Sequence, residues 1–250
     1  MMLFPRVVHT NKEGEGEMKK MLLVMAAGAL FAAGSATADT VTSVNVVGYY
    51  SVTIPANQLA LVTPVLEDFQ TGTVADLFGD ELPVGSTVYQ WDRSSNGYNI
   101  YNYNASFGGN VWKDGDNQTP TNIILRGDAM WVQPNSTNEI TVTFMGEVPG
   151  IYNQAETTTV ENISVADAIG YTYPVDMLWT NTAIAQSPDL STVHFWNGTG
   201  WDTYNKSPGF GGVFVWDSPD AETKVLKAGE AFWVEINSPT NWVEHAPYLL

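Results

Sequence analysis

One six-residue string occurs twice in this chain of 250 residues, as Gly127-Asp128-Ala129-Met130-Trp131-Val132 and as Gly229-Glu230-Ala231-Phe232-Trp233-Val234. Four of the six positions are identical, and the other two exchange Asp for Glu and Met for Phe. A repeat of this kind restricts the chain to folds that can hold the same element twice.

Other residues keep the same order around the two strings. The spacing between copies drifts only from 105 residues at Trp91 and Trp196 to 102 at Trp131 and Trp233. The matched groups are Thr87–Trp91 with Thr192–Trp196, Gly97-Tyr98 with Gly200-Trp201, Tyr101 with Tyr204, Phe107–Gly109 with Phe210–Gly212, and Trp112 with Trp216. A unit of about 100 residues is the size of a small β-sandwich. We therefore predict two tandem β-domains, residues 39–146 and residues 147–250.

The clearest predicted strand is Val44–Ile54, in which small and apolar residues alternate with mostly polar ones. Period-two alternation indicates a half-buried strand. Pro55 should end the strand, because proline has no N–H to donate to the ladder.

Valine-rich and aromatic runs between turn residues predict further strands. Asn96-Gly97 and Asn197-Gly198 are expected to turn hairpins, and Thr73–Gly79 and Ser164–Gly170 to form short capped helical turns. The predicted strands are Thr87–Trp91, Tyr98–Tyr103, Ile123–Val132, Glu139–Phe144, Thr192–Trp196, Trp201–Tyr204 and Lys224–Val234. Ile123–Val132 and Lys224–Val234 are each expected to be interrupted by their glycine. The expected class is all-β, with two sandwich-like domains, at most short helical turns, and cores built on the matched tryptophans.

The N-terminal residues have the composition of an export signal. Met18-Lys19-Lys20 is basic, Met21–Gly34 is apolar, and Ala36-Thr37-Ala38 is a small-residue cleavage site, which predicts a signal peptide over residues 18–38. Residues 1–17 are expected to precede the true start of the protein. The protein should then be extracellular or on the cell surface, with the periplasm as an alternative.

Charge and cysteine content exclude several partners. The formal net charge is −17 and there is no cysteine, so disulfides and thiol catalysis are excluded. Nucleic acid requires a basic surface, so none is expected as a partner. The apolar run before residue 38 is shorter than the roughly 20 residues of a membrane-spanning helix, so we expect no membrane span in the mature chain.

The sequence offers no recognisable catalytic centre, and we expect a protein that is not an enzyme. Nucleophile-elbow, phosphate-loop and histidine-rich metal motifs are missing. His194 occupies the position of Tyr89 in the other copy and should be a half-buried ring. Arg126-Gly127-Asp128 spells a cell-adhesion tripeptide, but the other copy has Ala228-Gly229-Glu230, which favours a structural element.

Two groups of residues are candidates for binding ligands. Aromatic rings could form a platform for sugars, or could fill the cores instead: Tyr98, Tyr101, Trp201 and Tyr204. Acidic clusters after the second tryptophan of each copy could bind Ca²⁺ weakly, or could be solvated turns: Asp114, Asp116 and Asn117, then Asp217, Asp220 and Glu222.

The chain also resembles a poorly characterised module of exported bacterial surface proteins, which closes with Leu-x-x-Gly-x-x-(Phe/Tyr)-Trp-(Ile/Val). Leu226–Val234 fits this string, whereas in Leu125–Val132 the glycine comes one residue early and Met130 replaces the aromatic residue. The resemblance implies a secreted β-module and transfers no catalytic residue.

Two functions are compatible with these observations. The first is a non-enzymatic structural or assembly protein of the cell surface, self-associating through Val44–Ile54, whose nearest charged neighbours are Asp39 and Glu67. Alternatively, that strand pairs fully within its own domain. The second function is a carbohydrate-binding module for a polysaccharide, with Ca²⁺ as an optional aid.

Overall fold

A computed structural model describes residues 46–67, 72–150, 157–188, 190–209 and 214–248, which belong to one compact unit. We call residues 46–150 the first half and residues 157–248 the second half. The predicted early start, the signal peptide, Val44 and the Phe210–Gly212 match lie outside the described residues.

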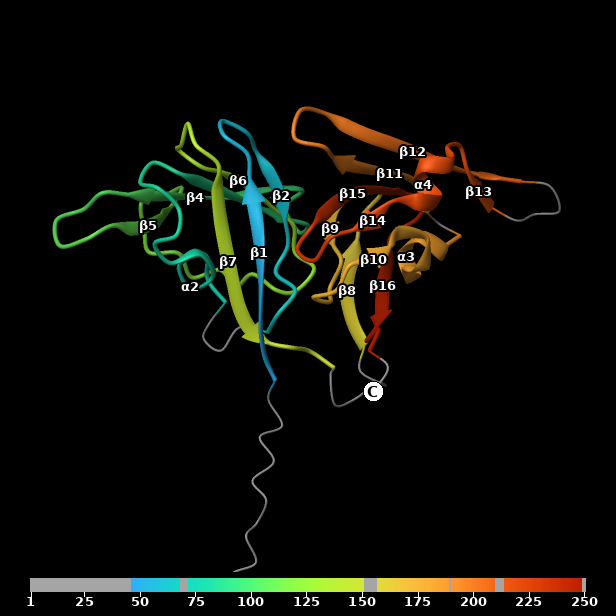
Figure 1. The fold of residues 1–250 in the computed structure, drawn as a ribbon, viewed down its shortest axis with the longest axis horizontal. Coiled ribbons are helices and arrows are strands. Elements are labelled where there is room, and N and C mark those ends of the chain that lie inside the picture. The colour runs from blue at the N-terminus through green and yellow to red at the C-terminus, as the bar shows by residue number, and fades with distance from the viewer. Residues whose placement is uncertain (1–45, 68–71, 151–156, 189, 210–213, 249–250) are drawn as a thin grey trace, which may run out of the picture. The chain divides into compact units, whose positions relative to one another are not determined.

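The first half has a five-stranded antiparallel sheet and a separate pair of strands (Figure 1). The sheet order is β2 (Ala60–Val62), β6 (Met130–Gln133), β3 (Thr87–Asp92), β4 (Gly97–Asn104) and β5 (Val111–Asp114). The pair is β1 (Val47–Ile54) with β7 (Ile140–Glu147), and the one helix among the described residues of this half is α2 (Val74–Phe78).

The second half has the same two kinds of sheet and a few additional short elements. Its five-stranded sheet runs β9 (Ala166–Gly170), β15 (Ala231–Ile236), β11 (Leu190–Trp196), β12 (Trp201–Pro208) and β13 (Phe214–Trp216), and its pair is β8 (Thr157–Ile163) with β16 (Thr240–His245). The additions are β10 (Met177–Leu178) with β14 (Val225–Leu226), η1 (Trp179–Asn181), α3 (Ala183–Gln186) and α4 (Pro219–Thr223). None of the described helices has the length and apolar character needed to cross a membrane.

The two five-stranded sheets have the same order of strands along the chain. Trp131 and Trp233 lie in the strand next to the edge strand of each sheet, opposite Tyr89 and His194 respectively. The two five-stranded sheets, together with only short helices among the described residues, confirm the all-β prediction. The origin of the halves by duplication stays a hypothesis.

Each half is a two-layer sandwich, because alternate residues of its strands face a core. In the first half, Val88 and Val132 of the sheet pack with Tyr50 and Phe144 of the β1–β7 pair. The last two rings stack at 4.9 Å between centroids. In the second half, Val193 and Phe232 of the sheet belong to one buried cluster with Val160 and Trp242 of the β8–β16 pair.

Two local predictions were wrong. Thr73–Gly79 does form a helix with a capping box between Thr73 and Asp76, but the similar Ser164–Gly170 contains strand β9. There the carboxylate of Asp167 accepts the N–H of Ser164, which fixes an extended bend instead of a helical turn.

The second error concerns Ile123–Val132, of which only the part from Met130 is a strand. Gly127 has φ +84° within a turn in which Leu125 N–H donates to the Asp128 carboxylate. Lys224–Val234, in contrast, is interrupted at its glycine as predicted, with strands Val225–Leu226 and Ala231–Ile236 on either side. In this turn, Lys227 N–H donates to Glu230 and Gly229 has φ +83°.

Candidate functional site

Four of the matched tryptophans pack where the two five-stranded sheets meet, and we call this cluster the seam: Trp91, Trp131, Trp196 and Trp233. The rings of Trp91 and Trp233 lie 4.8 Å apart between centroids, and those of Trp131 and Trp196 lie 5.1 Å apart. Trp91 of one half corresponds to Trp196 of the other, and Trp131 to Trp233. The two contacts are therefore reciprocal, as in an interface between two identical subunits.

The backbone repeats this reciprocity. Thr63 N–H donates to the carbonyl of Gly229 at 3.0 Å, and Gly170 N–H donates to the carbonyl of Gly127, also at 3.0 Å. Two single β-bridges follow the same exchange, Val62 with Glu230 and Ile169 with Asp128. The halves are thus held together by hydrogen bonds as well as by rings.

The expectation that the matched tryptophans fill the core of each half is wrong in place for these four: Trp91 is buried and the other three are partly buried, but all four pack in the seam. Of the three matched pairs, only Trp112 and Trp216 pack with the core clusters. On β3, Tyr89 and Trp91 lie on the face opposite Val88, because side chains alternate along a strand. A strand that is apolar on both faces is a sign of burial on both faces, and this signal could have indicated the seam.

A buried ion pair closes one end of the seam. The side chain of Asp167 is fully buried; it accepts the Trp91 Nε1–H at 2.6 Å and lies 3.2 Å from Arg93 Nε. Burial raises the pKa of Asp167, although the positive charge of Arg93 opposes that rise. At the other end, Trp196 Nε1–H donates to the backbone carbonyl of Leu59 at 2.8 Å, so the acceptor there is a neutral group.

Two predicted platform residues lie at the surface of the seam. Tyr98 is 41% exposed and Trp201 is 40% exposed. Both contact Trp131: its Nε1–H donates to the Tyr98 hydroxyl at 3.3 Å, and its ring lies 5.6 Å from that of Trp201. Burial raises the pKa of Tyr98. The structure thus brings together one ring from each half, through a tryptophan that sequence reasoning had placed in a core.

The other two platform residues belong to the cores. Tyr101 is 1% exposed and its hydroxyl donates to the side chain of Gln90 at 2.8 Å. Tyr204 packs against Phe195 at 6.0 Å between ring centroids. For Tyr101 the core-filling alternative describes the structure, because a ring this buried cannot stack on a sugar.

Polar side chains lie on the same faces of the two sheets as the exposed rings, in a pattern that repeats between the halves. Thr87 donates to Asn102 at 3.1 Å, and Thr192 donates to Asn205 at 3.3 Å. Tyr89 donates to Gln133 at 3.0 Å, and the equivalent His194 has its Nε2 3.3 Å from a carboxylate oxygen of Glu235. His194 is a half-buried ring in the position equivalent to Tyr89, as its place in the repeat suggests.

The first acidic cluster forms a turn. One carboxylate oxygen of Asp114 accepts the N–H groups of Asp116 at 3.0 Å and Gln118 at 2.7 Å, and Asn117 has φ +61°. These bonds explain the local geometry without a cation. Calcium binding here stays a prediction.

The second acidic cluster is spread over two elements. Asp217 follows β13, and its carboxylate accepts hydrogen bonds from both the backbone N–H and the side-chain amide of Asn205. The hydrogen bond from the side chain of Asn205 lowers the pKa of Asp217. Asp220 and Glu222 lie on α4. Within the described residues, no three His, Asp or Glu side chains are grouped so that they could hold a metal ion.

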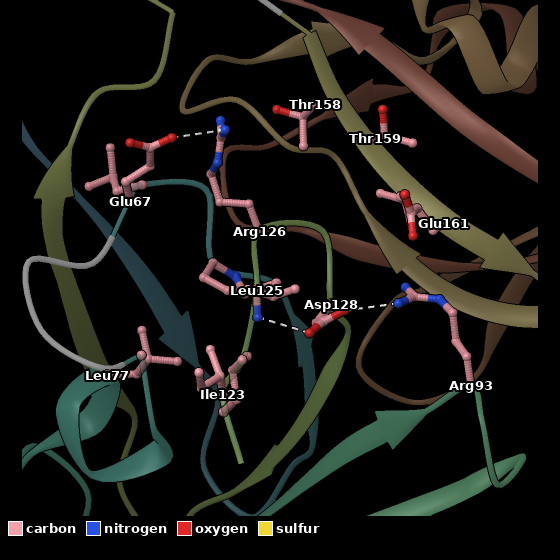
Figure 2. A pocket seen from close by; sticks show the side chains of 15 residues that line it. Glu67, Leu77, Arg93, Ile123, Leu125, Arg126, Asp128, Thr158, Thr159 and Glu161 are labelled. Carbon is pink, nitrogen blue, oxygen red and sulfur yellow. Dashed lines mark hydrogen bonds and ion pairs between the residues drawn. The ribbon is translucent and has the colours of Figure 1, made fainter. Parts of the chain in front are cut away.

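A pocket beside the seam is lined by Arg126 and Asp128 of the Arg126-Gly127-Asp128 tripeptide (Figure 2). Figure 2 shows the two charged side chains diverging: Arg126 reaches Glu67 at 3.0 Å, and Asp128 reaches Arg93 at 2.9 Å. Arg126 also lies over the ring of Tyr173. Both charged side chains are only 14% exposed, so the tripeptide takes part in internal ion pairs.

Comparison with protein-family models finds none that matches this chain. Searches among curated proteins and among solved structures find no match either.

Proposed function

We propose that this protein is a non-enzymatic, exported assembly protein that associates with further copies of itself through strand β1. The observation that carries this proposal is a free edge. Strand β1 pairs with β7 over its whole length, and no strand among the described residues pairs with its other edge. Unpaired N–H and C=O groups of an edge strand can accept a strand of another chain.

The register identifies the free groups. Thr143 on β7 donates its backbone N–H to the carboxylate of Glu81, so that N–H does not bond the backbone of Ser51, its partner on β1. In an antiparallel pair, the N–H and C=O of such a non-bonded residue point away from the partner strand. The outward groups of β1 are therefore those of Tyr49, Ser51 and Thr53, at alternate positions.

Charge favours contact between copies at this strand. The chain carries a formal net charge of −17, yet Val47–Ile54 contains no charged residue. On its outer face, Val47 is 64% exposed and Tyr49 is 79% exposed, and Tyr49 is paired with Met145, which is 71% exposed. Contiguous exposed apolar side chains are typical of interaction surfaces.

The buried acids support a role outside catalysis, because each has a structural partner. Asp167 binds Trp91 and Arg93 within the seam. Glu244 accepts the N–H of Ala183 at 2.9 Å and the Nε1–H of Trp242 at 3.0 Å, in the second core. A raised pKa in a carboxyl group can indicate catalysis, but structural networks raise it too.

Proline at Ser51 tests the proposal. It removes an outward N–H while β1 keeps its backbone hydrogen bonds to β7 and loses only the hydroxyl contact between Ser51 and Thr143. Proline is tolerated at such edge positions. We expect residues 39–250 to form large species in sedimentation velocity, and Ser51→Pro to shift them to monomers. Ser51→Thr keeps the N–H and should assemble like the original chain.

Deleting β1 would be a poor test, because Tyr50 and Ile54 belong to the first core. Tyr49→Lys should weaken assembly by placing a charge on the outer face. The proposal fails if the original chain stays monomeric at high concentration, or if the proline and threonine variants assemble alike while both are folded by circular dichroism.

A further inference from the structure

We infer that the exposed border of the seam is a binding site for a neutral glycan chain, built from both halves of the protein. We call it the rim and define it by these residues: Tyr89, Tyr98, Asn102, Trp131, Gln133, His194, Trp201, Thr203 and Glu235. The inference does not depend on assembly through β1, which lies in a separate two-stranded sheet.

Fixed rings supply the apolar part of the site. Tyr98 packs against Trp91 at 5.1 Å and 67° between ring planes, and Trp201 packs against Trp196 at 5.3 Å and 69°. Both rings still leave about two fifths of their surface to solvent. Aromatic rings that are held in place offer contact area at a low cost in conformational entropy. The C–H faces of a pyranose ring are the apolar surface that such rings can cover.

Hydrogen-bonding groups lie on the same faces of the two sheets as the rings. Gln133 and Thr203 are exposed, and Asn102 is partly exposed. His194 Nδ1 lies 2.8 Å from the Thr203 hydroxyl, and Gln133 accepts from Tyr89, so the polar groups are positioned as well. Amides, hydroxyls and an imidazole both donate and accept, which matches sugar hydroxyl groups.

Charge decides between classes of glycan. The rim contains no lysine or arginine, and its carboxylate, Glu235, is exposed in a chain of formal net charge −17. A polymer of uronic acids or sulfated sugars would be repelled. An apolar peptide would leave the polar groups of the rim without hydrogen-bond partners, and this would lower the binding energy. A neutral glycan satisfies both parts of the site.

The test is affinity electrophoresis of the full mature chain in gels that contain one soluble polysaccharide each: a β-glucan, an α-glucan, a mannan, and a uronic acid polymer. We expect a gel that contains one of the neutral polysaccharides to retard the protein, and the gel that contains the uronic acid polymer not to retard it. Tyr98→Ala and Trp201→Ala should each weaken the retardation at least about tenfold in dissociation constant, as central Tyr and Trp contacts do elsewhere. Tyr98→Phe keeps the ring and should stay within a few-fold of the original.

Tyr49→Ala is the matched control, because it removes an exposed tyrosine from β1 and leaves the rim intact. It should bind glycan normally, whatever it does to assembly. Melting curves verify that each variant is folded. The inference is overturned if no neutral gel retards the protein, if only the acidic gel does, or if the folded rim variants keep full retardation. Rim variants that change sedimentation instead would mark the rim as a contact between proteins.

Discussion

In the second half, the buried carboxyl group of Glu244 lowers the stability of the fold when it is ionised. Glu244 is 8% exposed, and burial raises the pKa of its carboxyl group, against the bonds from Ala183 and Trp242 that lower it. The folded state therefore holds the proton more tightly than the unfolded chain does. It follows that Glu244 reduces the stability of the fold as the pH rises above 4.5, the ordinary pKa of a glutamate, and through the raised pKa.

Glu244→Gln should remove this loss. Both hydrogen bonds end on one carboxylate oxygen, which an amide oxygen can replace. The melting temperature of the variant minus that of the original should be near its minimum below pH 4.5 and should increase toward pH 8. Thermal melts in a buffer series measure it. A difference that does not change with pH would show that Glu244 stays charged at no cost.

At the scale of single elements, the two glycine turns before β6 and β15 let the halves approach. A Cβ on Gly127 would lie 2.8 Å from the Val160 side chain, and one on Gly229 would lie 2.4 Å from the ring of Tyr50. Both neighbours belong to the opposite half. Positive φ and close approach thus act together at both turns.

Alanine at Gly127 should therefore cost about 2–5 kcal/mol of unfolding free energy, from a left-handed backbone and from overpacking. Gly108→Ala shares the positive φ but has no neighbour within 4 Å, so it should cost only about 1–2 kcal/mol. Gly115→Ala has neither feature and should be nearly neutral. Urea unfolding measures the three values, and equal losses at Gly127 and Gly108 would remove the role of close approach.

The sequence predicted elements well where alternation is local. Val44–Ile54 was predicted as a strand, and Val47–Ile54 is β1; Thr87–Trp91 and Glu139–Phe144 also correspond to strands, β3 and β7. The sequence could not show that β1 pairs with β7, because this contact joins residues about ninety positions apart in the chain. Strand β8 was missed, since Thr157–Ile163 is mostly polar and only two of its side chains are fully buried.

The candidate site was predicted only in part, for a similar reason. Tyr98 and Trp201 were predicted as platform residues from their residue type, and both are exposed. Tyr101 is also a tyrosine and was predicted in the same way, but it is buried. A strand pattern shows which residues share a face and does not show what covers that face. The contribution of Trp131 depends on how the two halves meet, which no local pattern contains.

At the scale of the whole molecule, the two halves behave as partners in an interface. They exchange equivalent ring contacts and equivalent backbone hydrogen bonds. The rim exists only where they meet, because Tyr98 comes from one half and Trp201 from the other. Binding at the rim therefore depends on the seam being intact.

The reciprocal seam can be tested by cutting the chain between the halves. A protease site placed within residues 151–156 would break the covalent link and leave every described contact in place. We expect the cleaved halves to elute together in gel filtration at micromolar concentration and to keep the near-ultraviolet circular dichroism of the tryptophan cluster. Trp91→Ala should weaken this association. Halves that separate while each stays folded would contradict the reciprocal seam.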